Sequence, residues 1–196
     1  MNELEHSGLI RRVFGGATLI VGSDKQVPLF VLEREFGKEK DKLCEQAASF
    51  ISDGNILFID GSSTMQFLVP YLSKFNNLVV ITNGLKIAQM LSEIHIKVYI
   101  AGGLLMENSS VITGHDTEKF IDNFNADICF LSYKGLSDDG KLIDTSSEET
   151  KSRKYYLKNA NKKNILMTSN KVGKKYILTL CNVEEVDHLL LSNPLT

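Results

Sequence analysis

Two hydrophobic patterns alternate along the chain from Lys38 to the C-terminus. Short apolar runs such as Ile56 to Ile59 and Leu78 to Ile81 contain no polar alternation, which is typical of strands buried on both faces of a sheet. Between them lie stretches with apolar residues every three or four positions, which favour helices. Repeated strand-helix units of this kind predict an α/β fold with a mostly parallel sheet flanked by helices.

The same pattern sets the bounds of the expected elements. We expect helices at residues 38–52, 64–73, 85–92, 117–123 and 148–161. We expect strands at residues 56–60, 78–82, 97–101, 128–132, 164–168 and 188–191. The segment 135–147 is polar, rich in Asp and Ser, and too long for an ordinary connection, so we predict that it is a functional flap. The first 36 residues differ: residues 1–7 fit the end of a helix, and residues 9–14 fit an exposed strand before a Gly15-Gly16 turn.

The composition of the chain argues against several classes of protein. The chain has 196 residues, with 22 Lys and Arg against 24 Asp and Glu, so it offers no overall attraction to nucleic acid or to an anionic membrane. Cys44, Cys129 and Cys181 lie far apart and form no CxxC pair, which excludes a disulfide framework and a zinc ribbon. No apolar run approaches the roughly 20 residues of a membrane span, and the N-terminus is not a signal peptide, so we expect a cytoplasmic protein.

Candidate chemistry gathers where the predicted strands end. Ligands of open parallel sheets bind beyond the carboxyl ends of the strands. Asp60-Gly61-Ser62-Ser63-Thr64 follows one strand and precedes a helical pattern. Small residues, hydroxyls and free helix amides suit an anion such as a phosphate. An ordinary N-cap at Ser62 or Ser63 uses the same groups and explains the segment equally well.

Other strand ends carry similar residues. Thr82-Asn83-Gly84 ends the second strand and Gly102-Gly103 the third, and together they predict a small polar crevice, although each alone fits a turn. Lys171 follows the strand 164–168, where its ammonium can reach a phosphate, although an exposed lysine is the commoner outcome. Glu148 and Glu149 complement a helix dipole, with a sugar-hydroxyl or catalytic role as the rarer alternative.

The remaining sequence patterns do not match known catalytic or cofactor-binding motifs. The segment from Gly135 to Lys141 fits GxxxxGK, but Leu142 replaces Ser or Thr, and Asp138 and Asp139 would repel phosphates. The chain contains no GxGxxG, HExxH or GxSxG motif, so we expect no cofactor, no metal and no catalytic triad. A basic set is best explained as a solvated helix face: Lys151, Arg153, Lys154, Lys158, Lys162 and Lys163.

An ordered series of short motifs resembles the DeoR family of bacterial regulators across nearly the whole chain. The series is Arg12-Val13-Phe14-Gly15-Gly16-Ala17, residues 60–64, Thr82-Asn83, Gly102-Gly103, Gly114, residues 126–131, Gly135-Leu136 and Ser169-Asn170-Lys171-Val172-Gly173. Each motif is weak alone, but their order and spacing are specific. Two residues depart from the family pattern: Thr168 stands where Asp is usual, and Lys134 where a small or neutral residue is usual.

The resemblance implies a division of the chain and a set of ligand contacts. Residues 1–30 correspond to a remnant of a winged helix-turn-helix, with its wing and a linker. Residues 31–196 correspond to an effector-sensing domain similar in fold to ribose-phosphate isomerases and CoA transferases. The implied phosphate contacts are Ser62, Ser63, Thr64 and Lys171, with Asp60, Asn83, Gly102, Gly103 and Glu148 around the sugar. Gly61, Thr82 and Gly135 complete the expected site, and Lys134 either adds a second cation or indicates a different effector.

The resemblance also implies a function. It indicates a non-catalytic sensor of a phosphorylated sugar, part of a regulator of sugar metabolism that is usually a repressor and a homo-oligomer. Operator DNA would be bound only through the N-terminal part, most of which is missing. One alternative is a sugar-phosphate isomerase with Asp60 or Glu148 as general base. Another is an oligomerisation module that binds no small molecule.

Overall fold

The protein is described here as a computed structural model that covers residues 10–13, 15–19, 32, 35–107 and 109–193. The expected helix end at residues 1–7 and the expected boundary between residues 30 and 31 lie outside the described residues. Near the N-terminus, β1 (Ile10–Val13) and β2 (Gly16–Leu19) form an antiparallel pair joined through Gly15, whose φ is 86°. The strand predicted before the glycine turn is therefore present in the described residues.

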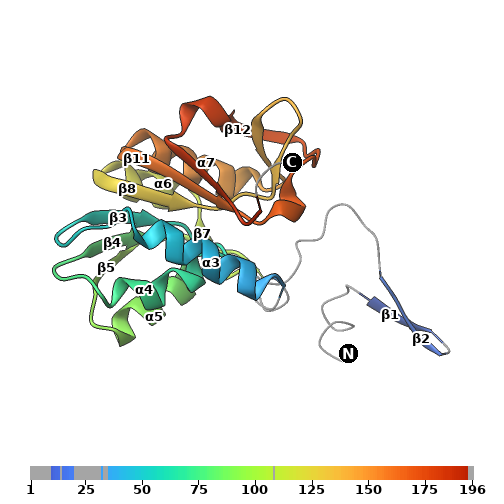
Figure 1. Cartoon of the computed structure of the whole chain (residues 1–196), viewed down its shortest axis with the longest axis horizontal. Helices are drawn as coiled ribbons and strands as arrows, with labels where there is room; N and C mark the ends of the chain where they lie inside the picture. Colours follow the sequence, from blue (N-terminus) through green and yellow to red (C-terminus); the bar gives the residue numbers. More distant parts are fainter. Residues whose placement is uncertain (1–9, 14, 20–31, 33–34, 108, 194–196) are drawn as a thin grey trace.

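A six-stranded parallel sheet forms the centre of the α/β part (Figure 1). Its order is β13-β11-β8-β3-β4-β5. The strands are β3 (Ile56–Ile59), β4 (Val79–Thr82), β5 (Lys97–Ile100), β8 (Ala126–Leu131), β11 (Ala160–Met167) and β13 (His188–Leu191). This sheet confirms the predicted α/β class and all six predicted strands, although β11 begins four residues earlier than expected.

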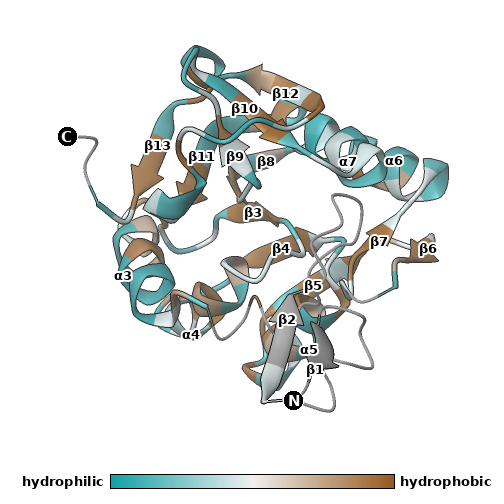
Figure 2. Ribbon diagram, turned by 90° about the vertical axis from the view of Figure 1, so that its right-hand side faces the viewer, coloured by the Kyte–Doolittle hydropathy of each residue, from teal (hydrophilic) through white to brown (hydrophobic). Residues whose placement is uncertain are grey.

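Helices cover both faces of the sheet (Figure 1). On one face lie α3 (Gly37–Ala48), α4 (Val69–Leu72) and α5 (Leu85–Glu93), and on the other α6 (His115–Asp122) and α7 (Ser147–Lys158). Strand side chains alternate between the two layers: Leu57 and Ile59 pack with the first set of helices, and Phe58 packs with the second. Both faces of the central strands are therefore apolar. In Figure 2 the ribbons of β3 and β4 have the brown colour of hydrophobic residues.

One predicted helix is wrong. Residues 64–73 do not form a single helix but a 3-10 turn, η1 (Met65–Phe67), and the one-turn helix α4. Pro70 lies in the first turn of α4 and has no backbone N–H to donate into a preceding helical turn, so an uninterrupted helix is not available. The turn at Ser62 to Thr64 therefore has no long helix behind it to supply a dipole.

The predicted flap is a structured hairpin. β9 (Gly135–Leu136) and β10 (Lys141–Asp144) pair antiparallel, and β10 also pairs with β12 (Leu178–Asn182) in a three-stranded sheet of order β12-β10-β9. A further small hairpin joins β6 (Leu104–Leu105) and β7 (Ile112–Thr113), and short 3-10 turns occur at η2 (Ser169–Lys171) and η3 (Val183–Glu185). Among the described helices, none has the length and apolar character needed to cross a membrane.

Candidate functional site

The carboxyl ends of the central strands lie side by side. The sheet register aligns Ile59 of β3 with Thr82 of β4 and with Phe130 of β8. The residues that follow these strands therefore meet at one edge of the sheet, as the strand-end argument predicts. Asp60 is the first of them, and only 2% of its surface is exposed.

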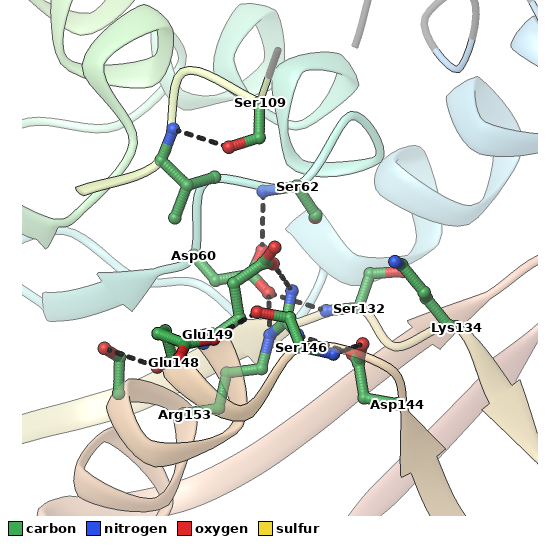
Figure 3. A network of polar contacts seen from close by, with 12 residues as sticks. Asp60, Ser62, Ser109, Ser132, Lys134, Asp144, Ser146, Glu148, Glu149 and Arg153 are labelled. Carbon is green, nitrogen blue, oxygen red and sulfur yellow. Dashed lines mark hydrogen bonds and ion pairs between the residues drawn. The ribbon is translucent and has the colours of Figure 1, made fainter. Parts of the chain in front are cut away.

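The Asp60 carboxylate holds two strand ends together (Figure 3). Its Oδ1 accepts a hydrogen bond from the backbone N–H of Ser62 at 3.1 Å, and its Oδ2 accepts one from the backbone N–H of Ser132 at 3.2 Å. Hydrogen bonds from backbone N–H groups to a carboxylate are charge-assisted and strong, so they fix the orientation of the peptide groups that donate them. Asp60 thereby sets the shape of the turn that follows β3 and its position against the end of β8.

Arg153 reaches the same carboxylate from α7 (Figure 3). Its Nε donates to Asp60 Oδ2 at 3.0 Å, its Nη1 to Asp144 Oδ2 at 2.7 Å and its Nη2 to Glu149 Oε2 at 2.8 Å. The Arg153 side chain is 7% exposed, so its assignment to a solvated helix face is wrong. The helical period gives the reason: Arg153 shares the buried stripe of α7 with Glu149 and Tyr156, whereas Lys154 is exposed as predicted.

The carboxylates around Arg153 keep its guanidinium protonated. Burial alone lowers the pKa of the guanidinium, but the carboxylates of Glu149, Asp144 and Asp60 raise it above its usual value. Arg153 therefore stays protonated, and the three carboxylates gather around it. Because the cluster is an ion-pair network around a guanidinium, it is not a metal site, and no His, Cys, Asp or Glu cluster suited to a metal occurs in the described part of the chain.

Two ammonium groups approach a row of hydroxyls beside this cluster. Thr64 Oγ1 donates to Ser132 Oγ at 3.3 Å, and Lys171 Nζ donates to the same Ser132 oxygen at 3.0 Å. From α3, Lys40 Nζ donates to Ser63 Oγ at 3.2 Å and also contacts the carbonyl of Leu32. Lys40 is 3% exposed, which is unusual for a lysine.

The charge of Lys171 depends on its surroundings. Burial is the main cause that lowers the pKa of Lys171 to about 8, and the cations of Lys40 and Arg153 lower it further, against the carboxylates of Asp60 and Asp144. The site thus holds positive charge at close range, at the hydroxyl-lined end of the sheet. An anion placed between these ammonium groups would relieve their repulsion.

The ordinary N-cap explanation of Ser62 and Ser63 does not hold. The residue before η1 is Thr64, and its side chain makes no capping bond. Ser62 Oγ is buried and has no hydrogen-bond partner among the described residues. A buried hydroxyl without a partner is costly, so this oxygen calls for a ligand or water.

The neighbouring strand end is occupied by structural hydrogen bonds. Asn83 Nδ2 donates to the carbonyl of Ile112 at 2.9 Å, and the Tyr156 hydroxyl donates to Asn83 Oδ1 at 3.1 Å. Thr82 Oγ1 accepts from the backbone N–H of Gly84 at 3.0 Å. A Cβ on Gly61 would lie 2.9 Å from the Gly84 Cα, so this glycine allows the two strand ends to touch.

The other predicted site residues lie farther along the rim. The carbonyl of Gly102 accepts from Thr117 Oγ1 at 2.7 Å, which ties the end of β5 to α6. Gly103 has a φ of 144°, a conformation that favours glycine. Three more predicted residues lie in or next to the β9–β10 hairpin. Lys134 precedes β9 and donates to Thr145 Oγ1 at 2.5 Å, and Gly135 is buried in β9. Glu148 is exposed in the first turn of α7, which follows β10.

The structure thus brings five of the predicted residues together and adds three. Hydrogen bonds link Asp60, Ser62, Thr64 and Lys171, mostly through Ser132, and Ser63, between Ser62 and Thr64 in the chain, bonds Lys40. Sequence reasoning missed Lys40, Ser132 and Arg153. Lys40 has a detectable signal, since it lies three and four positions before the apolar Leu43 and Cys44 and thus on the buried stripe of α3. Ser132 directly follows β8, so the strand-end rule applies to it as well.

Comparison with known proteins finds the chain similar to transcriptional regulators. The family model described as the DeoR C terminal sensor domain matches residues 35–193. The HTH-type transcriptional regulator GolR of Listeria innocua is 30% identical over 194 residues, which cover 98% of this chain and 76% of that regulator. The Glycerol-3-phosphate regulon repressor of Escherichia coli is 27% identical over 195 residues, 99% of this chain and 77% of that repressor.

Solved structures share the fold at low identity. A D-ribose-5-phosphate isomerase in complex with phospho-erythronic acid superposes with a TM-score of 0.53 and 13% identity, over 69% of this chain and 54% of the isomerase. The eIF2B delta of Chaetomium thermophilum superposes with a TM-score of 0.61 and 13% identity, over 85% of this chain and 60% of that protein. At these identities the likeness establishes the fold alone.

Proposed function

The chain belongs to the DeoR family of regulators through its C-terminal sensor domain, and from this premise we propose that it binds a phosphorylated sugar or polyol. In this proposal the bound effector changes how the winged helix-turn-helix part holds operator DNA, within a homo-oligomeric repressor of sugar metabolism. Residues 31–196 are the sensor, and residues 1–30 are the wing and linker. The described domain carries out no reaction of its own.

One observation carries the proposal. Lys40 and Lys171 bring two ammonium groups to the hydroxyls of Ser63 and Ser132 at the carboxyl end of the sheet. Ser62, which precedes Ser63 in the same turn, has a buried Oγ without a hydrogen-bond partner among the described residues. A phosphate monoester carries about two negative charges and three acceptor oxygens near pH 7, which suits this combination of ammonium and hydroxyl donors.

The names of relatives agree with this ligand class. One relative is the Glycerol-3-phosphate regulon repressor of Escherichia coli. Another, from Staphylococcus epidermidis, is the Lactose phosphotransferase system repressor, 26% identical over 97% of this chain and 77% of that repressor. Both names concern the metabolism of sugars or of a phosphorylated polyol, so a phosphorylated effector is the consistent choice for this chain.

The contacts of the carboxylates favour a sensor over an isomerase. A general base for aldose-ketose isomerisation needs a carboxylate free to accept a proton from carbon. Asp60 is instead occupied by Arg153 and two backbone amides, and Glu148 is exposed on α7. The shared fold with the isomerases leaves that reaction as the second candidate to be tested.

A thermal-unfolding screen tests the proposal. The panel contains sn-glycerol 3-phosphate, ribose 5-phosphate and hexose 6-phosphates, each beside its unphosphorylated counterpart. A ligand that binds only the folded state at about 100 times its Kd adds about 2.7 kcal/mol to the free energy of unfolding. We expect at least one phosphorylated compound to raise the Tm and its unphosphorylated partner to leave it unchanged.

Variants localise the effect. Lys171→Met and Lys40→Met should each abolish the ligand-induced rise in Tm, whereas the exposed Lys154→Met on α7 should keep it. The free energy of unfolding of each variant is measured without ligand to show that the variant is folded. If every phosphorylated compound leaves the Tm of the wild type unchanged, the proposal fails. Solvent deuterium incorporation into a bound sugar phosphate would instead favour the isomerase.

A further inference from the structure

Arg153 joins three separate parts of the chain at one buried point. Its guanidinium bonds Asp60 at the end of β3, Asp144 at the end of β10 and Glu149 in its own helix. Asp60 and Arg153 are 93 residues apart in sequence. The hairpin, the first turns of α7 and the turn that carries the effector hydroxyls therefore share a single cation (Figure 3).

Two of the three carboxylates on Arg153, those of Asp60 and Asp144, also accept hydrogen bonds from backbone amides. Asp60 accepts the N–H groups of Ser62 and Ser132. Asp144 Oδ1 accepts the N–H of Thr145 at 2.6 Å and that of Ser146 at 3.2 Å. If Arg153 were absent, these buried carboxylates would lack their cation, and a carboxylate without its partner would be driven to turn towards water or to take up a proton.

Each of the three guanidinium nitrogens is engaged with a carboxylate, and the side chain is only 7% exposed. Nε, Nη1 and Nη2 each donate to a different carboxylate. A planar guanidinium can donate hydrogen bonds to several acceptors in fixed directions, and the ammonium group of a lysine cannot reproduce this geometry. Arg153 therefore acts on the effector turn through Asp60 rather than by touching the effector.

We propose that Arg153 is a positioning residue of the effector site, which holds Asp60 so that the Ser62 and Ser132 hydroxyls and the Lys171 ammonium face one bound anion. This inference rests on the proposed function for the identity of the anion. It adds that the same guanidinium connects the effector turn to β10 and α7. A shift of Asp60 on effector binding thus moves the anchor of the hairpin and of the helix, which gives the site a physical route to other surfaces of the domain.

A double-mutant cycle tests the positioning role. The variants are Arg153→Lys, Asp60→Asn and the two together, with Lys154→Met as the matched control on α7. Calorimetry measures the affinity for inorganic phosphate and for sn-glycerol 3-phosphate. Each single variant should lose about tenfold or more in affinity, the size expected for one charge-assisted hydrogen bond. The double variant should lose no more than Asp60→Asn alone, because Arg153 acts through that carboxylate.

A measurement without ligand separates this inference from the proposed function. Amide hydrogen exchange at Ser62 and Ser132, followed by NMR, should accelerate in Arg153→Lys, while the amide of Leu91 in the core of α5 should exchange as in the wild type. If those two amides keep their exchange rates, or if the two affinity losses add in the double variant, the positioning role is refuted. If the wild type binds no phosphorylated compound but the amides respond as expected, only the proposed function fails.

Discussion

Raising the pH through 8 should weaken binding of a phosphorylated effector because Lys171 loses its proton. Burial, assisted by Lys40 and Arg153, lowers the pKa of Lys171 to about 8 in the unliganded protein. A bound phosphate places negative charge beside the ammonium and raises that pKa again. The bound state therefore holds the proton more tightly than the free state, and binding takes up a proton at pH values above about 8.

The size of the effect follows from the titration. With a pKa of about 8, roughly nine tenths of Lys171 is protonated at pH 7 and roughly one tenth at pH 9. If only the protonated form binds, the Kd rises about tenfold over this interval. The phosphate itself contributes little, since its second pKa lies near 6 and the ligand is already a dianion at pH 7.

Titration calorimetry at pH 7, 8 and 9 in two buffers of different ionisation enthalpy measures both the Kd and the proton uptake. Lys171→Arg is the matched control, because a guanidinium keeps its charge throughout this range and should give a flat profile. A Kd in the wild type that stays constant from pH 7 to pH 9 would refute the reasoning. The same conclusion holds if Lys171→Arg loses affinity in parallel with the wild type.

The same lysine makes an independent prediction about the unliganded protein. Its folded-state pKa of about 8 lies below the ordinary value of 10.5, so the unfolded state binds more protons between these two pH values. The contribution of Lys171 to the free energy of unfolding should therefore rise with pH across this window. Urea unfolding of wild type and Lys171→Met at pH 7.5 and 9.5, compared pairwise, isolates that contribution.

Three further predictions concern the scaffold. Phe58→Ala, which removes a fully buried ring 5.0 Å from that of Tyr156, should lower the free energy of unfolding by about 3–5 kcal/mol in urea titrations. Gly61→Ala, whose Cβ would lie 2.8 Å from Val111 Cγ2 and 2.9 Å from the Gly84 Cα, should cost about 1–3 kcal/mol in the same assay. The control is Gly102→Ala, which enters open space; equal losses in the two glycine variants would contradict the packing argument. The third prediction concerns the free cysteines Cys44, Cys129 and Cys181, which are buried. Because burial raises the pKa of each thiol, a thiol reagent should label them only after unfolding, and rapid labelling of the native protein would contradict their burial.

The sheet was predictable from sequence because its strands are buried on both faces. Runs such as the one from Ile56 to Ile59 give a signal that needs no knowledge of distant partners. Their carboxyl ends then identified Asp60 and the hydroxyls of residues 62–64, since chain direction alone puts these residues at one edge. The break in the helix after Thr64 was also readable in principle, because Pro70 stands inside the predicted span.

The buried cations were not predictable in the same way. Periodicity indicates which positions of a helix face inward, but a charged residue on that stripe is normally assigned to solvent. Arg153 is buried because three carboxylates from two other segments and its own helix converge on it, and Asp60 is 93 residues distant. Such convergence depends on the tertiary fold. The strand β12 was missed for a similar reason, since it is defined by its pairing with β10 rather than by a pattern of its own.

The positions of the charged side chains at the site, rather than their net charge, favour the binding of an anion. Asp60, Asp144 and Glu149 carry three negative charges, and Arg153, Lys40 and Lys171 carry three positive ones when protonated. All three carboxylates are bound to Arg153, and on the hydroxyl side Lys40 donates to Ser63 and Lys171 donates to Ser132. If Arg153 were removed, the Asp60 carboxylate would be free to turn towards those ammonium groups and to compete with the effector for them. The hydroxyl side of the site can therefore bind an anion only while the guanidinium keeps these carboxylates apart from the lysines.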